Sequence, residues 1–175
     1  TVSHFTVNSE ISDEELYNAI NEIIKSTQAL SKSNTGALIV LVNNAMPSHI
    51  VESGVKLNAA ISAALLESIF NIKSPLHDGA VIIKANKLVA AGCFLPLSQD
   101  TNLPKELGTR HRAAIGITEN YDVLTIIISE ETGVISVAKG GALSRYYDSS
   151  MLNQTLTEFY GLSVPQTETK KRRRK

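Results

Sequence analysis

Residues 35–43 read TGALIVLVN, and this short apolar run decides the class of fold. Every side chain from Ala37 to Val42 is apolar, with no alternation between apolar and polar residues. A strand with one solvated face alternates, whereas a strand buried on both faces reads as a continuous apolar run. The run therefore predicts a buried strand, and helices must cover both sides of its sheet.

Further β-type runs supply the rest of the expected sheet. Residues 80–97 read AVIIKANKLVAAGCFLPL, and two such runs surround the polar tip KANK, which predicts a hairpin. Residues 122–143 read DVLTIIISEETGVISVAKGGAL and predict two more strands around SEETG, followed by a turn at 139–141. Residues 46–58 predict a turn, a short extended piece and another turn. Together these segments indicate a sheet of about six strands.

Helical patterns lie between these strands. From Ser12 the sequence SDEELYNAINEIIKSTQALSKS has an apolar stripe at helical spacing, and Ser12 and Glu15 form a capping box at its start. The other expected helices are 59–70, 109–120 and 147–162, with a short helix near Pro104 in the surface loop 98–108. The predicted fold class is α/β: a single globular domain, residues 13–162, with helices flanking a central mixed β-sheet. Residues 1–12 are expected to be irregular, and residues 163–175 to be a basic, disordered tail.

The composition agrees with one soluble globular domain, since 43% of the 175 residues are hydrophobic and 19% are charged. No run approaches the roughly 18 apolar residues that a membrane helix needs, and the N-terminus has no signal-peptide pattern. A single cysteine, Cys93, excludes an internal disulfide and fits a reducing setting, so the expected location is cytoplasmic. Cys93 lies in the apolar stretch VAAGCFLPL, which favours a small packed side chain over a nucleophile.

The net charge of zero hides an uneven distribution. The stretch KKRRRK at 170–175 holds six of the 17 basic residues, so residues 1–169 carry 11 basic and 17 acidic groups. Such a tail can bind nucleic acid or an anionic membrane surface, but a disordered tail or an expression remnant explains it equally well. The body is too acidic for a broad nucleic-acid footprint, so no nucleic acid is expected as a partner. An anionic substrate must therefore be met by a few placed cations.

The first segment with possible chemistry is SPLHDGAVII at 74–83. Asp78 followed by Gly79 is a turn signature, and a turn before a strand needs no further explanation. The alternative is a site, because α/β sheets place ligands at strand ends. Gly79 and Ala80 would leave room for a ligand to approach the backbone. The Asp78 carboxylate could hold Mg²⁺ or Mn²⁺, or take a proton from a hydroxyl.

The second segment, GTRHR, runs from Gly108 to Arg112 and concentrates positive charge in an otherwise acidic body. Arginine suits phosphate because its planar guanidinium makes paired, charge-assisted hydrogen bonds. The start of the helix adds free backbone N–H donors, and Thr109 adds a hydroxyl. A solvated helix start with salt bridges is the structural alternative. Arginine in a first turn opposes the helix dipole, however, and this favours a role in anion binding.

The third segment is SEETG at 129–133, directly after the apolar strand LTIII. A polar hairpin turn accounts for it without any function. The alternative is that Ser129 and Glu130, at the end of their strand, face the same cleft as Asp78. Each of the three segments is a weak or moderate signal by itself. Together they place a carboxylate, an arginine cluster and a hydroxyl–carboxylate pair where a nucleotide site would be built.

Three stretches, HDGAVII, LGTRHRAAIGI and IIISEETGVISVAKGG, resemble the diadenylate cyclase (DAC) domain, the cyclic di-AMP synthase family. The family's Asp-Gly-Ala and Arg-His-Arg motifs correspond to residues 78–80 and 110–112. The likeness continues through TGALIVL, SGVKLNAAIS and AGCFLPLS and covers roughly residues 13–160. Two separate motifs in the right order, with their flanks, make this resemblance specific.

The resemblance implies that two ATP molecules are condensed into cyclic di-AMP with release of two pyrophosphates. In the family each domain binds one ATP, and two domains meet face to face, so a homodimer or higher homo-oligomer is the expected catalytic form. The implied cofactor is Mn²⁺ or Mg²⁺. Asp78 would ligate the metal and position or deprotonate the ribose 3′-hydroxyl, and His77 would be a second metal ligand.

The resemblance also implies the rest of the ATP site. Catalytic roles fall to Asp78 and to the arginine cluster, which consists of Arg110, His111 and Arg112. Together with Thr109, this cluster would hold the triphosphate and offset the charge on the leaving pyrophosphate. Ser129 would contact phosphate, and Glu130 would help to hold the metal. The implied ATP-binding residues are Gly79, Ala80, Phe94, Leu95, Gly108, Thr109, Arg110, His111, Arg112, Ser129 and Glu130. Phe94 stands where members of the family often have tyrosine, so stacking is kept but a hydroxyl contact is not.

Two questions stay open at this point. A non-catalytic sensor that binds ATP or cyclic di-AMP is the alternative to the enzyme, and a nucleic-acid-binding module that uses KKRRRK is a third hypothesis. Many relatives place this domain after transmembrane helices, so the chain is either a soluble protein or the cytosolic domain of a membrane-anchored one. Any membrane link would run through segments absent from this chain.

Overall fold

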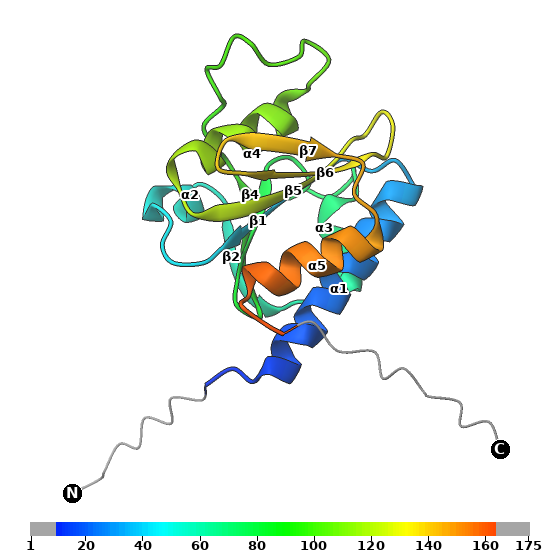
Figure 1. Cartoon of the computed structure of the whole chain (residues 1–175), viewed down its shortest axis with the longest axis vertical. Helices are drawn as coiled ribbons and strands as arrows, with labels where there is room; N and C mark the ends of the chain where they lie inside the picture. The colour runs from blue at the N-terminus through cyan, green and yellow to red at the C-terminus, as the bar shows by residue number, and fades with distance from the viewer. Residues whose placement is uncertain (1–9, 164–175) are drawn as a thin grey trace, which may run out of the picture.

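The computed structural model describes residues 10–163, which form a seven-stranded sheet covered by helices on both faces (Figure 1). The order of the strands across the sheet is β2-β4-β3-β1-β5-β6-β7, so β1 lies at the centre. The strands are β1 Ala37–Val42, β2 Val55–Ala60, β3 Ala80–Lys84, β4 Lys87–Cys93, β5 Val123–Ile128, β6 Ile135–Lys139 and β7 Ala142–Arg145. The helices are α1 Asp13–Lys32, α2 Ser48–Glu52, α3 Ala63–Phe70, α4 Thr109–Asn120 and α5 Ser149–Phe159. The predicted α/β class, with a central mixed sheet flanked by helices, is confirmed.

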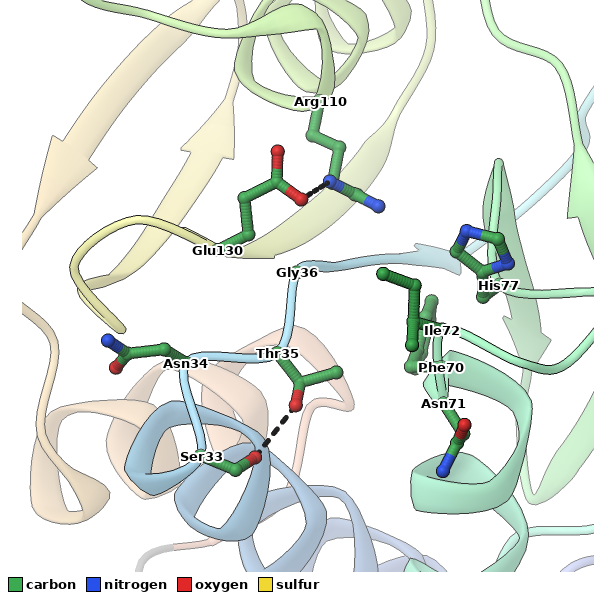
Figure 2. A pocket seen from close by; sticks show the side chains of 10 residues that line it. All are labelled: Ser33, Asn34, Thr35, Gly36, Phe70, Asn71, Ile72, His77, Arg110 and Glu130. Atoms are coloured by element: carbon green, nitrogen blue, oxygen red, sulfur yellow. Dashed lines mark hydrogen bonds and ion pairs between the residues drawn. The ribbon is translucent and has the colours of Figure 1, made fainter.

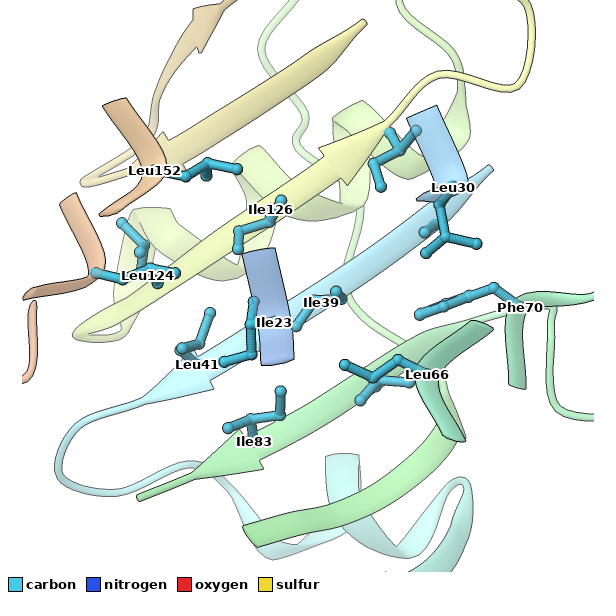
Figure 3. Packing of buried hydrophobic residues seen from close by; sticks show 14 of the residues in the cluster. Ile23, Leu30, Ile39, Leu41, Leu66, Phe70, Ile83, Leu124, Ile126 and Leu152 are labelled. Atoms are coloured by element: carbon cyan, nitrogen blue, oxygen red, sulfur yellow. The ribbon is translucent and has the colours of Figure 1, made fainter. Parts of the chain in front are cut away.

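The central strand is buried on both faces, as its unbroken apolar run predicts. All six residues of β1 are buried, and so are all six of β5 beside it. Helices α1, α3 and α5 cover one face, where Ile23, Leu66 and Leu152 from these three helices pack over the strands (Figure 3). Helices α2 and α4 cover the other face (Figure 1). Two hydrophobic layers therefore hold the sheet, and neither face of β1 meets water.

The directions of the strands decide which strand ends lie side by side. β1 pairs in parallel with β3 and antiparallel with β5, and β3 pairs antiparallel with β4. The amino ends of β1 and β3 therefore lie beside the carboxyl ends of β4 and β5, on the same side of the sheet. Ala37 lies opposite Ile128, and Ala80 lies opposite Cys93. The segments just outside these positions come together at these strand ends.

Several local predictions are confirmed, and others are wrong at the margins. Helix α1 has the predicted capping box: the Glu15 N–H donates to the Ser12 hydroxyl, and the Ser12 N–H donates to the Glu15 carboxylate. Helix α4 has the predicted bounds. The helix predicted at 59–70 begins only at Ala63, because the Ser62 hydroxyl caps it by accepting the Leu65 N–H at 3.1 Å.

The two outer strands carry weak sequence signals, and this explains the remaining differences. β2 occupies part of the segment predicted as turn, extended piece and turn, and it takes residues 59 and 60 from the predicted helix. It is mostly exposed and bulges at Asn58, so it lacks an apolar alternation. β7 is a four-residue, mostly exposed edge strand that raises the predicted six strands to seven. A single turn of helix, α2, replaces a predicted turn.

The loop 98–108 contains no helix near Pro104, contrary to the prediction. The Leu107 N–H donates to the Pro104 carbonyl, which makes one turn and no more. None of the helices in residues 10–163 is long and apolar enough to cross a membrane. Residues 1–9 of the predicted irregular segment lie outside the described residues. So do residues 164–175 of the predicted basic tail, which include KKRRRK.

Candidate functional site

Two adjoining cavities lie where the amino ends of β1 and β3 meet the carboxyl ends of β4 and β5. The larger, of about 320 Å³, has a mainly polar rim from the loops before β1 and after β5 and from the segment after α3 (Figure 2). It is lined by Ser33, Asn34, Thr35, Gly36, Phe70, Asn71, Ile72, His77, Arg110 and Glu130. The smaller, of about 120 Å³, is mainly apolar and is lined by Leu38, Asp78, Gly79, Cys93, Phe94, Leu95, Leu97, Thr109, Arg110 and Ala113. Arg110 lines both cavities and forms the wall between them.

Arg110 reaches the cavities from the first turn of α4. Its Nη1 lies 3.3 Å from Oε2 of Glu130, which follows β5, and this contact is both a hydrogen bond and an ion pair. The Arg110 side chain is 22% exposed, whereas that of Glu130 is 65% exposed. The Nε atom of Arg110 is buried and has no hydrogen-bond partner within the described residues. The first turn of α4 contains no acidic residue, so positive charge accumulates at this point.

His77 and Asp78 are neighbours in the sequence but line different cavities. His77 faces the larger cavity, and its Nδ1 lies 2.7 Å from the Ser74 carbonyl oxygen. A carbonyl only accepts, so this contact assigns the proton to Nδ1 and leaves Nε2 as the free acceptor. Asp78 is exposed and lies at the smaller cavity. The two side chains therefore lie at different cavities, although the residues are adjacent in the chain.

Gly79 lines the smaller cavity and packs tightly against the backbone of β4. Its φ of +116° is in the region that favours glycine. A Cβ at Gly79 would lie 2.8 Å from the Cys93 carbonyl oxygen and 2.8 Å from the carbonyl carbon of Gly92, so the backbone of β4 occupies the space. The expected room for a ligand is thus partly filled by the protein itself. Ala80 is fully buried in β3 and lines neither cavity.

The smaller cavity has the predicted apolar residues at its mouth. Phe94 is 67% exposed, and its N–H donates to the Ser53 hydroxyl at 3.0 Å. Leu95 and Thr109 line the same cavity. Gly108 is the N-cap of α4, makes no side-chain cap, and has nothing within 4 Å of the place where a Cβ would stand. The free N–H groups at the start of α4 therefore border this cavity without a competing cap.

The other two residues of the arginine cluster point elsewhere. His111 is buried, its Nε2 has no partner within the described residues, and it lines neither cavity. Burial, with Arg145 and Arg110 nearby, lowers the pKa of His111. Arg112 donates from Nη2 to the Pro104 carbonyl at 3.3 Å, and its own carbonyl accepts the Ser98 N–H at 3.0 Å. Arg112 thus ties down the loop 98–108 in this structure.

Ser129 holds the turn after β5. Its hydroxyl oxygen accepts the N–H groups of Glu131 and Thr132, at 3.2 and 3.3 Å, and it lines neither cavity. Ser129 makes the turn, as the structural interpretation of SEETG predicted. The prediction that Ser129 and Glu130 share a cleft with Asp78 is wrong, because Glu130 lines the larger cavity and Asp78 the smaller one. Cys93 is buried, and burial raises the pKa of its thiol, which agrees with the predicted packing role.

Sequence reasoning missed part of the larger cavity. The missed part comes from the segment between α1 and β1 and from the end of α3 and the segment after it. The residues missed there are Ser33, Asn34, Thr35, Gly36, Phe70, Asn71 and Ile72. The only available signal was the polar side chain of Thr35 in front of an otherwise apolar run. Nothing in the sequence indicates that the segment after α3 lies beside it.

Metal-binding capacity in residues 10–163 is limited: no group of three or more His, Cys, Asp or Glu side chains is placed to hold an ion. His77 and Glu130 do share the larger cavity, and they offer one imidazole and one carboxylate. Mg²⁺ is commonly held by one or two carboxylates together with substrate phosphates. The residues present therefore fit a metal that shares its coordination with a nucleotide, and they do not form a closed protein cage.

Comparison with known proteins gives the relatives of this chain. Residues 24–143 match the family model DAC, described as DisA bacterial checkpoint controller nucleotide-binding. Over 144 residues the chain is 49% identical to a protein named diadenylate cyclase from Listeria monocytogenes. It is 46% identical over the same length to one named cyclic di-AMP synthase CdaA from Bacillus subtilis. Each match covers 82% of this chain and 53% of the relative, so the chain spans about half the length of these curated relatives.

Solved structures agree with the sequence relatives. The crystal structure of a double mutant of DacA from Staphylococcus aureus is 41% identical with a TM-score of 0.81, and the match covers 85% of this chain and 99% of that chain. A Bacillus cereus structure described as a hypothetical membrane spanning protein is 46% identical with a TM-score of 0.70, covering 73% and 63%. Because the family model spans more than half of the sequence and the fold matches over most of it, the chain belongs to the diadenylate cyclase (DAC) family.

Proposed function

We propose that this domain condenses two ATP molecules into cyclic di-AMP and releases two pyrophosphates. The observation that carries the proposal is the pair of adjoining cavities, one mainly apolar and one with a polar rim, with Arg110 between them. A nucleoside triphosphate has the same division into an aromatic base and a charged phosphate chain. The names of the Listeria and Bacillus relatives support the same reaction.

The two cavities suggest how one ATP is oriented. The adenine and ribose occupy the smaller cavity, between Phe94 and Leu95 on one side and the start of α4 on the other. The phosphate chain passes Arg110 into the larger cavity, where the polar rim receives it. Arg110 then lies near the α-phosphate, where its guanidinium offsets charge that develops as pyrophosphate leaves.

The reaction needs a second copy of the domain. In each half-reaction the ribose 3′-oxygen of one ATP forms a bond to the α-phosphorus of the other. The bond from that phosphorus to the bridging oxygen breaks, pyrophosphate leaves, and the 3′-hydroxyl loses its proton. One copy of the chain supplies one Asp78 and one Arg110, whereas a two-fold pair brings two equivalent half-sites together. Such proximity can supply up to about 7–11 kcal/mol of a barrier.

Asp78 is the residue that we assign to the 3′-hydroxyl. Its carboxylate is exposed at the mouth of the smaller cavity, so it can reach a group that belongs to the facing nucleotide. Arg110 binds phosphate directly. His111 and Arg112 line neither cavity, so we propose that they act by holding α4 and the loop 98–108 in place. Ser129 acts in the same way on the turn that carries Glu130.

We propose Mn²⁺ or Mg²⁺ as the cofactor, with His77, Asp78 and Glu130 as the candidate protein ligands. Such an ion would polarise the reacting phosphate and hydroxyl oxygens. His77 is suited to it because its Nδ1 contacts the Ser74 carbonyl, which leaves the lone pair of Nε2 for a metal. His77 and Glu130 line the larger cavity and Asp78 lines the smaller one, so the candidate ligands would come from both cavities.

The alternative function is a sensor that binds ATP or cyclic di-AMP without turnover. One experiment separates it from the enzyme: incubation with ATP and either Mn²⁺ or Mg²⁺, followed by chromatography of the nucleotides and a pyrophosphate assay. The enzyme yields cyclic di-AMP and two pyrophosphates per product molecule. Saturable ATP binding with neither product would identify the sensor and overturn the proposal.

We further propose that the domain works in the cytoplasm, where its substrate ATP is available. The relative from Bacillus cereus is described as membrane spanning, so a tether through another part of the protein is compatible with this proposal. Fractionation of cells that express the full-length protein, with an antibody to this domain, distinguishes a membrane-bound pool from a free one.

A further inference from the structure

Gly36 lies directly before β1 and lines the larger cavity beside the side chain of Arg110 (Figure 2). A Cβ atom at Gly36 would stand 2.6 Å from Nη1 of Arg110 and 2.8 Å from its Cζ. It would also stand 3.2 Å from the Cβ of Glu130. Both members of the ion pair therefore rest against the one position in this loop that has no side chain.

The backbone at Gly36 does not require glycine. Gly79 and Gly133 have positive φ angles, and a Cβ at either would collide with backbone atoms. Gly54 and Gly116 also pack tightly against backbone. Gly36 has no positive φ, and the two closest atoms that a Cβ would meet belong to the far end of a flexible arginine. A side chain at position 36 would consequently displace the guanidinium and leave the strands where they are.

The guanidinium has few other restraints. Its Nη1 is held by Glu130, which is largely exposed and therefore holds it weakly. Its Nε is buried without a partner among residues 10–163. Contact with the bare backbone at Gly36 is thus what confines the guanidinium plane to the wall between the two cavities.

We propose that Gly36 is a positioning residue for Arg110, and that its missing side chain sets where phosphate is bound. The inference rests on the proposed function, because it concerns the same nucleotide site. Gly36 touches no reacting atom in this role; it acts only through the arginine.

The test is Gly36→Ala, measured by calorimetric binding of ATP and of adenosine to the full chain. We expect ATP to bind roughly tenfold more weakly, the effect of losing one charge-assisted hydrogen bond. Adenosine, which has no phosphate, should bind as before. The free energy of unfolding should stay the same or rise, because alanine restricts the unfolded chain at a position whose backbone tolerates it.

A double-mutant cycle supplies the control. In an Arg110→Ala background, Gly36→Ala should change ATP affinity by less than about twofold, because the group that it displaces is gone. An equal loss in both backgrounds would overturn the proposal, as would an equal loss for adenosine or a fall in stability. Because binding is measured without turnover, a protein that makes no cyclic di-AMP would refute the proposed function and still leave this inference testable.

Discussion

The guanidinium of Arg110 lies 3.3 Å from the carboxylate of Glu130, and this ion pair joins the start of α4 to the loop after β5. Both residues of the pair line the larger cavity (Figure 2). Arg110 is therefore partly neutralised before any nucleotide arrives. A phosphate group that binds here must share the guanidinium with Glu130 or take it over.

Glu130→Gln should separate the two roles of this carboxylate. Without metal, ATP affinity should stay within about threefold of the unchanged protein, because an exposed ion pair contributes little. With Mn²⁺ or Mg²⁺, turnover should fall at least roughly tenfold if Glu130 helps to hold the ion. Calorimetry with a chelator and product assays with metal give the two values. Unchanged turnover would remove Glu130 from the metal site.

Asp78→Asn should keep ATP affinity within about an order of magnitude but abolish most turnover. The amide occupies the same space and can still contact a hydroxyl, but it neither accepts a proton nor neutralises a cation. Binding by calorimetry and product by chromatography should therefore diverge. Near-normal activity would exclude Asp78 from the chemistry.

Arg110→Ala and Arg112→Ala form a matched pair on one helix. Arg110→Ala should weaken ATP binding by roughly tenfold to a hundredfold, because phosphate charge loses its main partner. Arg112→Ala should weaken it less and instead speed amide hydrogen exchange in the loop 98–108, since the contact with the Pro104 carbonyl is lost. Equal losses of affinity without a change in exchange would mean that Arg112 also binds phosphate.

Stability should fall below neutral pH through His111. Burial lowers the pKa of this imidazole below its ordinary value of about 6.5. Between the two pKa values the unfolded chain binds more protons than the folded protein, so unfolding becomes easier as the pH drops below about 6.5. Urea denaturation at pH 7.5 and 5.5 measures the loss, and His111→Gln should reduce it. A pH dependence that is identical in the variant would assign the loss to other groups.

Specific activity should rise with protein concentration if the productive species is a transient dimer. Activity per molecule would then increase until most chains are paired, and mixing Asp78→Asn with unchanged protein should lower the activity of the mixture. Initial rates measured from nanomolar to micromolar protein show this directly. A constant specific activity over the whole range would indicate a stable oligomer or a competent single copy.

Much of the fold was predictable because it depends on local patterns. The unbroken apolar run of β1 indicated burial on both faces, and the capping box located the start of α1. The edge strands β2 and β7 escaped prediction because exposed strands carry no strong apolar pattern. Their existence depends on pairing with β4 and β6, which is information from distant parts of the chain.

By itself the sequence determined the α/β class, the helix at 109–120, the position of Asp78 before a strand and the position of the arginine cluster at the start of that helix. Only the tertiary structure decided which of these side chains share a cavity. Successive residues of a helix point about 100° apart, so Arg110, His111 and Arg112 cannot all face one cavity. The packing of α4 against β1 and β5 then brings Gly36, with no chemistry of its own, against Arg110. No local pattern encodes that contact, because it joins segments more than 70 residues apart in the chain.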